Sequence, residues 1–254
     1  IATLGVIPYI ALQLKAISTS IDVLLHYPDV TTRARAGEVV LATDTAFYVA
    51  ILLAAFTIVF GTRHLDATER HEGMVAAIAF ESVVKLAAFL AVGLFVTFGL
   101  YGGFGDLAAR AGALPQLGAM LTIAGADGWG SWTALTILSM LAILCLPRQF
   151  QLAVVENVDE DHLRRAMWLF PLYLLAINVF VLPIALGGLL RFPAGTVDPD
   201  TFVLTLPMAA GQQALALFVF LGGLSAATGM VIVETIALST MIGNSLVVPL
   251  LLRL

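Results

Sequence analysis

Hydrophobic positions along this chain run in long, nearly uninterrupted segments instead of alternating with polar ones. Barrel strands alternate over about 10 residues, so continuous runs of greater length predict membrane-spanning helices. We expect the last segment, which exceeds one bilayer thickness, to tilt or to continue into the aqueous phase. Six helices are predicted, at roughly Ile1–Leu25, Thr45–Gly61, Gly73–Tyr101, Trp132–Glu156, Ala166–Leu190 and Gln212 to beyond Leu238.

The fourth segment is interrupted. Its apolar part, Trp132–Leu146, reaches only about 22 Å at 1.5 Å per residue, which is short of the roughly 30 Å hydrocarbon core. Pro147 follows, and proline removes a backbone donor and clashes with the preceding turn. We expect the helix to open between Cys145 and Pro147 and to expose backbone groups in a solute-binding cavity. The alternative is that Pro147 ends a span at the membrane surface, where Arg148 snorkels to the headgroups.

Composition supports an all-α integral membrane protein. Of the 254 residues 60% are hydrophobic and 11% are charged, whereas soluble domains carry about 25% charged residues. The net charge of −5 argues against a nucleic-acid partner, and one cysteine excludes a disulfide framework. No motif of a hydrolase, a metalloprotease or a phosphate-binding loop occurs, so we expect neither an enzyme nor a resident cofactor in this stretch. Because the chain opens at Ile1 inside an apolar run, we expect residues 1–254 to be one partial transmembrane domain of a longer protein.

The polar connections predict the orientation. The short charged loops and the segment ends on their side carry six Lys and Arg residues, and the opposite side carries four. This excess places the short loops Thr62–Glu72 and Asn157–Arg165 in the cytoplasm. On the outer side, Gly102–Gly130 is a long loop rich in glycine and alanine. The proline-rich stretch Arg191–Pro207 is predicted to form a cap with short helical turns.

Ionisable residues inside the predicted spans are candidates for function, because charge at membrane depth is costly. Glu81 and Lys85 lie four residues apart and share one face of the third segment. Either they form a purely structural ion pair, or Glu81 carries a cation or proton and Lys85 tunes its affinity. Lys15 and Glu234 are two further ionisable residues in apolar segments.

The sixth segment contains small residues at helical spacing, in the pairs Gly222/Ala226 and Ser225/Gly229. Such pairs allow close approach between helices, and packing is their first expected role. Ser225 and Thr228 are also candidate ion-coupling residues, because a hydroxyl oxygen can bind a hard cation such as sodium. We expect no metal site beyond a possible sodium ion at Thr228.

Three stretches of the chain resemble the sodium/solute symporter family, and more narrowly the transporter domains of CbrA-type sensor histidine kinases. They are IPYIALQLKAISTSID, LPRQFQLAVVEN followed by HLRRAMWLFPLYLL, and GGLSAATGMVIVETIALSTMIGNSLVVPLLLR. The resemblance covers essentially the whole chain, and LPRQFQ is its most specific part. It implies a LeuT-like inverted-repeat fold of which this chain supplies core helices three to eight, with Pro147 in the discontinuous helix. It also places Glu81 where related symporters carry an acidic residue implicated in cation coupling.

One departure from the family bears on the coupling ion. The resemblance implies a pair of serine or threonine ligands for sodium in core helix eight. An ungapped match places this pair on Gly229 and Met230, and Thr228 lies one position early. The two hydroxyl ligands therefore become at most one, which makes proton coupling, or sensing without tight coupling, more plausible than strong sodium coupling.

These observations predict a secondary transporter in a bacterial inner membrane that binds a small polar solute, such as an amino acid or a carboxylate. Backbone groups opened near Cys145 and Pro147 would bind its polar groups, Phe150 would stack on its apolar part and Gln149 would orient it. Arg148 would pair with a carboxylate or anchor the cytoplasmic side. The resemblance adds a sensory role, with a cytoplasmic kinase domain in cis and a response regulator as partners. The alternative is a stand-alone sodium or proton symporter.

Overall fold

The structure is a computed structural model that describes residues 2–27, 45–61, 72–114, 117–118, 128–145, 147–150, 154, 157, 159–192 and 196–252. These residues form helices, and no strand occurs among them. The elements are α1 (Ala2–His26), α2 (Thr45–Gly61), α3 (Glu72–Leu94), η2 (Phe95–Leu100), α4 (Phe104–Gly112), α6 (Gly128–Cys145), α7 (Pro147–Phe150), α8 (Glu160–Arg191), η5 (Pro199–Thr201), α9 (Phe202–Ala209), α10 (Gln213–Ile242), η6 (Gly243–Val247) and α11 (Val248–Leu251).

In the described part of the chain, four helices are long and apolar enough to cross a membrane. They are Leu4–His26, Val75–Leu100, Glu160–Arg191 and Gln213–Leu251. This agrees with the predicted class of helical membrane protein. The other two predicted spans form the shorter helices α2 and α6, of 17 and 18 residues. The 39 residues from Gln213 to Leu251 extend about 58 Å at 1.5 Å per residue, so the last segment is longer than a bilayer, as expected.

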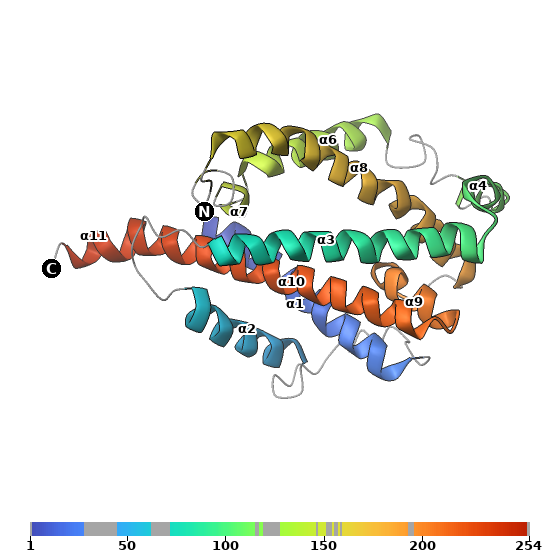
Figure 1. Cartoon of the computed structure of the whole chain (residues 1–254), viewed down its shortest axis with the longest axis horizontal. Coiled ribbons are helices and arrows are strands. Elements are labelled where there is room, and N and C mark those ends of the chain that lie inside the picture. The colour runs from blue at the N-terminus through green and yellow to red at the C-terminus, as the bar shows by residue number, and fades with distance from the viewer. Residues whose placement is uncertain are drawn as a thin grey trace.

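Helices α3 and α10 lie side by side at the centre of the molecule and run in opposite directions (Figure 1). Helix α8 packs against α3, whereas α1 and α2 pack against α10. Helix α9 contacts α1, α3, α8 and α10 near the start of α10. Helix α6 lies above this group in the figure, and α7 contacts both α6 and α10.

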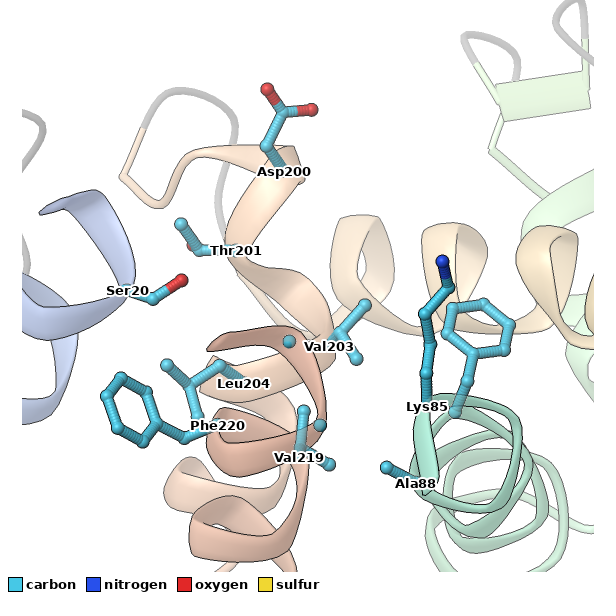
Figure 2. Close-up of a pocket in the computed structure, with 12 residues that line it drawn as sticks. Ser20, Lys85, Ala88, Asp200, Thr201, Val203, Leu204, Val219 and Phe220 are labelled. Carbon is cyan, nitrogen blue, oxygen red and sulfur yellow. The ribbon is translucent and has the colours of Figure 1, made fainter. Parts of the chain in front are cut away.

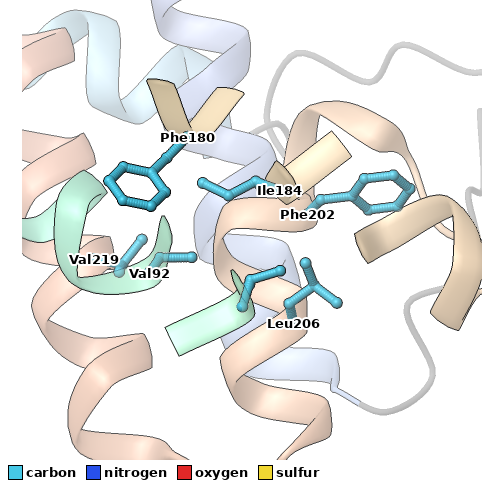
Figure 3. Packing of buried hydrophobic residues seen from close by; sticks show 7 residues of the cluster. Val92, Phe180, Ile184, Phe202, Leu206 and Val219 are labelled. Carbon is cyan, nitrogen blue, oxygen red and sulfur yellow. The ribbon is translucent and has the colours of Figure 1, made fainter. Parts of the chain in front are cut away.

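The main hydrophobic core lies where α3, α8, α9 and α10 meet (Figure 3). Glycines allow this approach, because a Cβ on Gly93 would overlap the Phe180 ring and one on Gly188 would overlap Phe202. A second cluster joins α1, α2 and α10 through Ile17, Leu53, Ala227 and Val231. The seven side chains of the main core are Val92, Val96, Phe180, Ile184, Phe202, Leu206 and Val219.

The predicted connections match the structure in part. The expected cap is present as η5 and α9. The outer loop predicted for Gly102–Gly130 instead contains helix α4. Helix α8 begins at Glu160, six residues before the predicted start, because Asp159 caps it by accepting a hydrogen bond from the Asp161 backbone N–H at 3.0 Å. Loop residues 28–44 and 62–71 lie outside the described residues.

Candidate functional site

Glu81 lies on the face of α3 that packs against α10. Its carboxylate is next to the backbone of Gly229, so closely that a Cβ built on this glycine would overlap both carboxylate oxygens. The charge of Lys85, one turn further along α3, acts favourably on Glu81. Tyr173 of α8 is close enough to Glu81 for the two side chains to interact electrostatically. The Tyr173 hydroxyl donates a hydrogen bond to the Ser82 carbonyl at 3.2 Å. A half-buried acidic side chain is thus held where α3, α8 and α10 meet.

A second glycine of α10 sets the register with α3. A Cβ on Gly222 would lie 2.9 Å from the Ala88 Cβ and 3.7 Å from the Lys85 Cα. Gly222 and Gly229 are seven residues apart, as are Ala88 and Glu81, so the two helices match in antiparallel order over two turns. The small residues predicted to allow close packing do so at Gly222 and Gly229.

Lys85 also lines a cavity of about 220 Å³ between α1, α3, η5, α9 and α10. Figure 2 shows Lys85 on one side of this cavity, with Ser20 and Thr201 on the other. The walls between them are mainly apolar. The lining residues are Ser20, Lys85, Ala88, Phe89, Asp200, Thr201, Val203, Leu204, Val219, Phe220, Gly222 and Gly223.

The predicted hydroxyl ligands lie on α10 near Gly229. The Thr228 hydroxyl lies 2.9 Å from the carbonyl oxygens of both Leu224 and Ser225, within its own helix. Ser225 and Thr228 are both half-buried. Because the Thr228 hydroxyl donates its hydrogen within α10, a cation at this residue would bind to the lone pairs of the hydroxyl oxygen. The same hydrogen bonding holds the Thr228 side chain in one orientation.

Two tyrosines that sequence reasoning missed contact this region. The Tyr9 hydroxyl of α1 donates to the Met230 Sδ at 3.1 Å, and Tyr173 of α8 reaches the backbone beside Glu81. Each is a phenolic hydroxyl inside an apolar segment, and this signal could have identified both. Glu234, one of the predicted ionisable residues, is 0% exposed and lies further along α10.

The predicted solute site lies at the end of α6 and on α7. Helix α6 ends at Cys145 and α7 begins at Pro147; Leu146 and the side chains of Cys145, Pro147 and Arg148 lie outside the described residues. Gln149 is half-buried and Phe150 is 59% exposed. Helix α7 contacts α10 beside its C-terminal half (Figure 1), and none of the described cavity residues comes from α7. The opening of the helix at membrane depth stays a prediction.

No protein-family model, curated protein or solved structure matches this chain. Neither the family nor the activity is therefore established by similarity.

Proposed function

We propose that this chain is the transmembrane part of a cation-coupled secondary transporter of the sodium/solute symporter type, with a LeuT-like inverted-repeat fold. The observation that carries the proposal is the Glu81 carboxylate against Gly229, between the two central helices. An acidic group within a membrane span is costly unless it pairs with a cation or takes up a proton. Gly229 provides the room for this group in the middle of the helix contact.

The surroundings of Glu81 favour a proton over sodium as the coupling ion. Sodium, as a hard cation, prefers several oxygen ligands. Gly229 has no side chain, Met230 offers a sulfur that accepts from Tyr9, and the Thr228 hydroxyl is bonded within its own helix. A single carboxylate can bind a proton without further ligands. Protonation of Glu81 would then remove the charge that Lys85 attracts and would lower the cost of keeping this carboxyl group between α3 and α10.

The proposed solute is a small polar organic molecule, an amino acid or a carboxylate, bound beside α7. Gln149 and Phe150 are the proposed orienting and stacking residues, and Arg148 is the proposed partner of a carboxylate. The contact of α7 with α10 supports a link between the solute and the ion, because α10 also carries Gly229. Alternating access around such a site needs no covalent chemistry.

A sensory role is proposed on the resemblance to kinase-fused transporter domains. Binding of the solute would shift the population of transmembrane states, and a cytoplasmic kinase domain in the same polypeptide would respond to this shift. A reading frame that continues past Leu254 into soluble kinase modules would support this role. A frame that continues only into further spans would favour the stand-alone symporter.

The transport proposal is tested with the full-length protein in proteoliposomes, by uptake of labelled histidine, proline and acetate under a sodium or a proton gradient. We expect accumulation driven by the proton gradient and its loss in Glu81→Gln. Glu160→Gln, at the exposed start of α8, is the matched control and should accumulate solute normally. No accumulation under either gradient would contradict the transport proposal and leave only the sensory role. Normal uptake by Glu81→Gln would contradict the proposed role of Glu81 in ion coupling.

A further inference from the structure

The cavity beside Lys85 lies apart from the predicted solute site on α7. Asp200 and Thr201 of η5 line it, together with Ser20 from the last two turns of α1. The distribution of Lys and Arg predicts that this end of the molecule faces away from the cytoplasm. Lys85 belongs to the middle part of the Val75–Leu100 span. The cavity therefore has Ser20 and Thr201 on one side and, on the other, a basic residue in the middle part of a predicted span.

The chemistry of the lining selects a ligand class. Lys85 supplies an ammonium group, which binds carboxylates through charge-assisted hydrogen bonds. Ser20 and Thr201 bring hydroxyls to the opposite side, and six of the other lining side chains are apolar. Lys85 is the one Lys or Arg among the described lining residues, so its charge matches a single carboxylate. A monoanion with an apolar body complements this arrangement.

The size of the cavity restricts the ligand further. Its volume of about 220 Å³ lies below the roughly 300–1,000 Å³ of sites for drug-sized molecules. Gly223 contributes a wall without a side chain, and a Cβ built there has nothing within 4 Å. Val219 and Phe220 also line the cavity, so a short branched hydrocarbon bound there would contact apolar side chains.

We infer that this outer cavity binds a small monocarboxylate with a short branched apolar body, and that Lys85 holds the carboxylate. This site is additional to the proposed one at α7 and does not depend on coupled transport. Because Lys85 also acts on Glu81 one turn away, an anion bound here would share the lysine charge and change the electrostatic field at Glu81. The outer site would thereby sense solute before it reaches the membrane centre.

The test measures binding of labelled isovalerate to the full-length protein in detergent by equilibrium dialysis, without any ion gradient. Competitors are L-valine, which adds an ammonium group to the same carbon skeleton, and isobutylamine, which replaces the carboxylate of valine's skeleton with hydrogen. We expect isovalerate to bind, L-valine to compete and isobutylamine not to compete. If L-valine competes more strongly than unlabelled isovalerate, the natural ligand is an amino acid, and if less strongly, a simple carboxylate.

Two variants locate the binding. Gly223→Leu adds a bulky side chain at a lining position and should lower the affinity for isovalerate by at least about tenfold. Gly5→Leu is the matched control, because a Cβ on Gly5 of α1 also has nothing within 4 Å and Gly5 does not line the cavity. Lys85→Met should abolish binding. Equal affinities of the two glycine variants, no binding by the wild type, or competition by isobutylamine would overturn the inference, whatever the uptake assay shows.

Discussion

Helices α3 and α10 contact each other along much of their length, whereas most described side chains of α6 are exposed. At Gly222 and Gly229 the contact is so close that particular atoms of α3 occupy the space a side chain would need. At Gly130 of α6, in contrast, a Cβ would have nothing within 4 Å. The difference separates two kinds of candidate site. Substitutions between α3 and α10 are expected to act on the fold and on function together, whereas substitutions of Gln149 and Phe150 on α7 are expected to act through a bound ligand.

The largest expected effect comes from placing one methyl group in the central contact. In Gly229→Ala, the new Cβ overlaps the Glu81 carboxylate, so the helices must separate or Glu81 must move, at a cost of about 1–3 kcal/mol. Gly130→Ala has open space in the first turn of α6 and should leave the free energy of unfolding nearly unchanged. Thermal unfolding in detergent, followed by tryptophan fluorescence, measures both. Equal shifts of the two unfolding temperatures would contradict the close contact.

The second prediction concerns the exposed region. Gln149→Ala and Phe150→Ala should each weaken binding of the transported solute by about tenfold, or 1.4 kcal/mol, without changing the unfolding temperature. The reason is that Phe150 is largely exposed and Gln149 is only half-buried, so truncating either side chain removes little packing. Solute affinity in detergent and membrane insertion are measured on the same preparations. Unchanged affinity in both variants would show that α7 does not bind the solute.

The sequence predicts the apolar segments well and the contacts between them poorly. Hydropathy locates helices such as α1 and α2 to within one or two residues, because long apolar runs have few alternatives in a membrane. Helix α4 is missed because its glycine and alanine content suggests a loop, although Asp106 and Arg110 lie four apart and support a helix. The early start of α8 is signalled by Asp159, a capping residue outside the apolar run.

At the candidate site, the sequence identifies Glu81 and Lys85 because a pair four residues apart can be recognised within one segment. The opposition of Glu81 and Gly229 involves two segments, and their register depends on packing that one helix does not specify. The seven-residue spacing of Gly222 and Gly229 indicates a close helix contact. It does not specify which helix packs there, or which of its residues lies against each glycine.

The third prediction tests the contact of α1 with α10. Tyr9→Phe removes the hydroxyl that donates to the Met230 Sδ at 3.1 Å, and should lower the free energy of unfolding by about 0.5–1 kcal/mol. Denaturation of Tyr9→Phe, Met230→Leu and the double variant gives the coupling between the two side chains. If Tyr9→Phe lowers the free energy of unfolding by the same amount in the Met230→Leu background as in the wild type, the hydrogen bond does not contribute to stability.

The smallest expected effect lies outside the spans, at the start of α4. Asp106 accepts hydrogen bonds from the Arg110 Nε at 2.9 Å and from the Gly102 backbone N–H at 3.0 Å, and these bonds hold the pKa of its carboxyl below the usual value. A lowered pKa in the folded state stabilises the fold above about pH 4 and loses this contribution as pH falls through the folded pKa. Asp106→Asn can still accept from Gly102 but lacks the charge that attracts Arg110. The unfolding temperature of the wild type should therefore exceed that of Asp106→Asn slightly at pH 7, and the difference should shrink below about pH 4 and in high salt. A difference that is independent of pH would mean that the ionised carboxylate has no role in holding α4 against the end of η2.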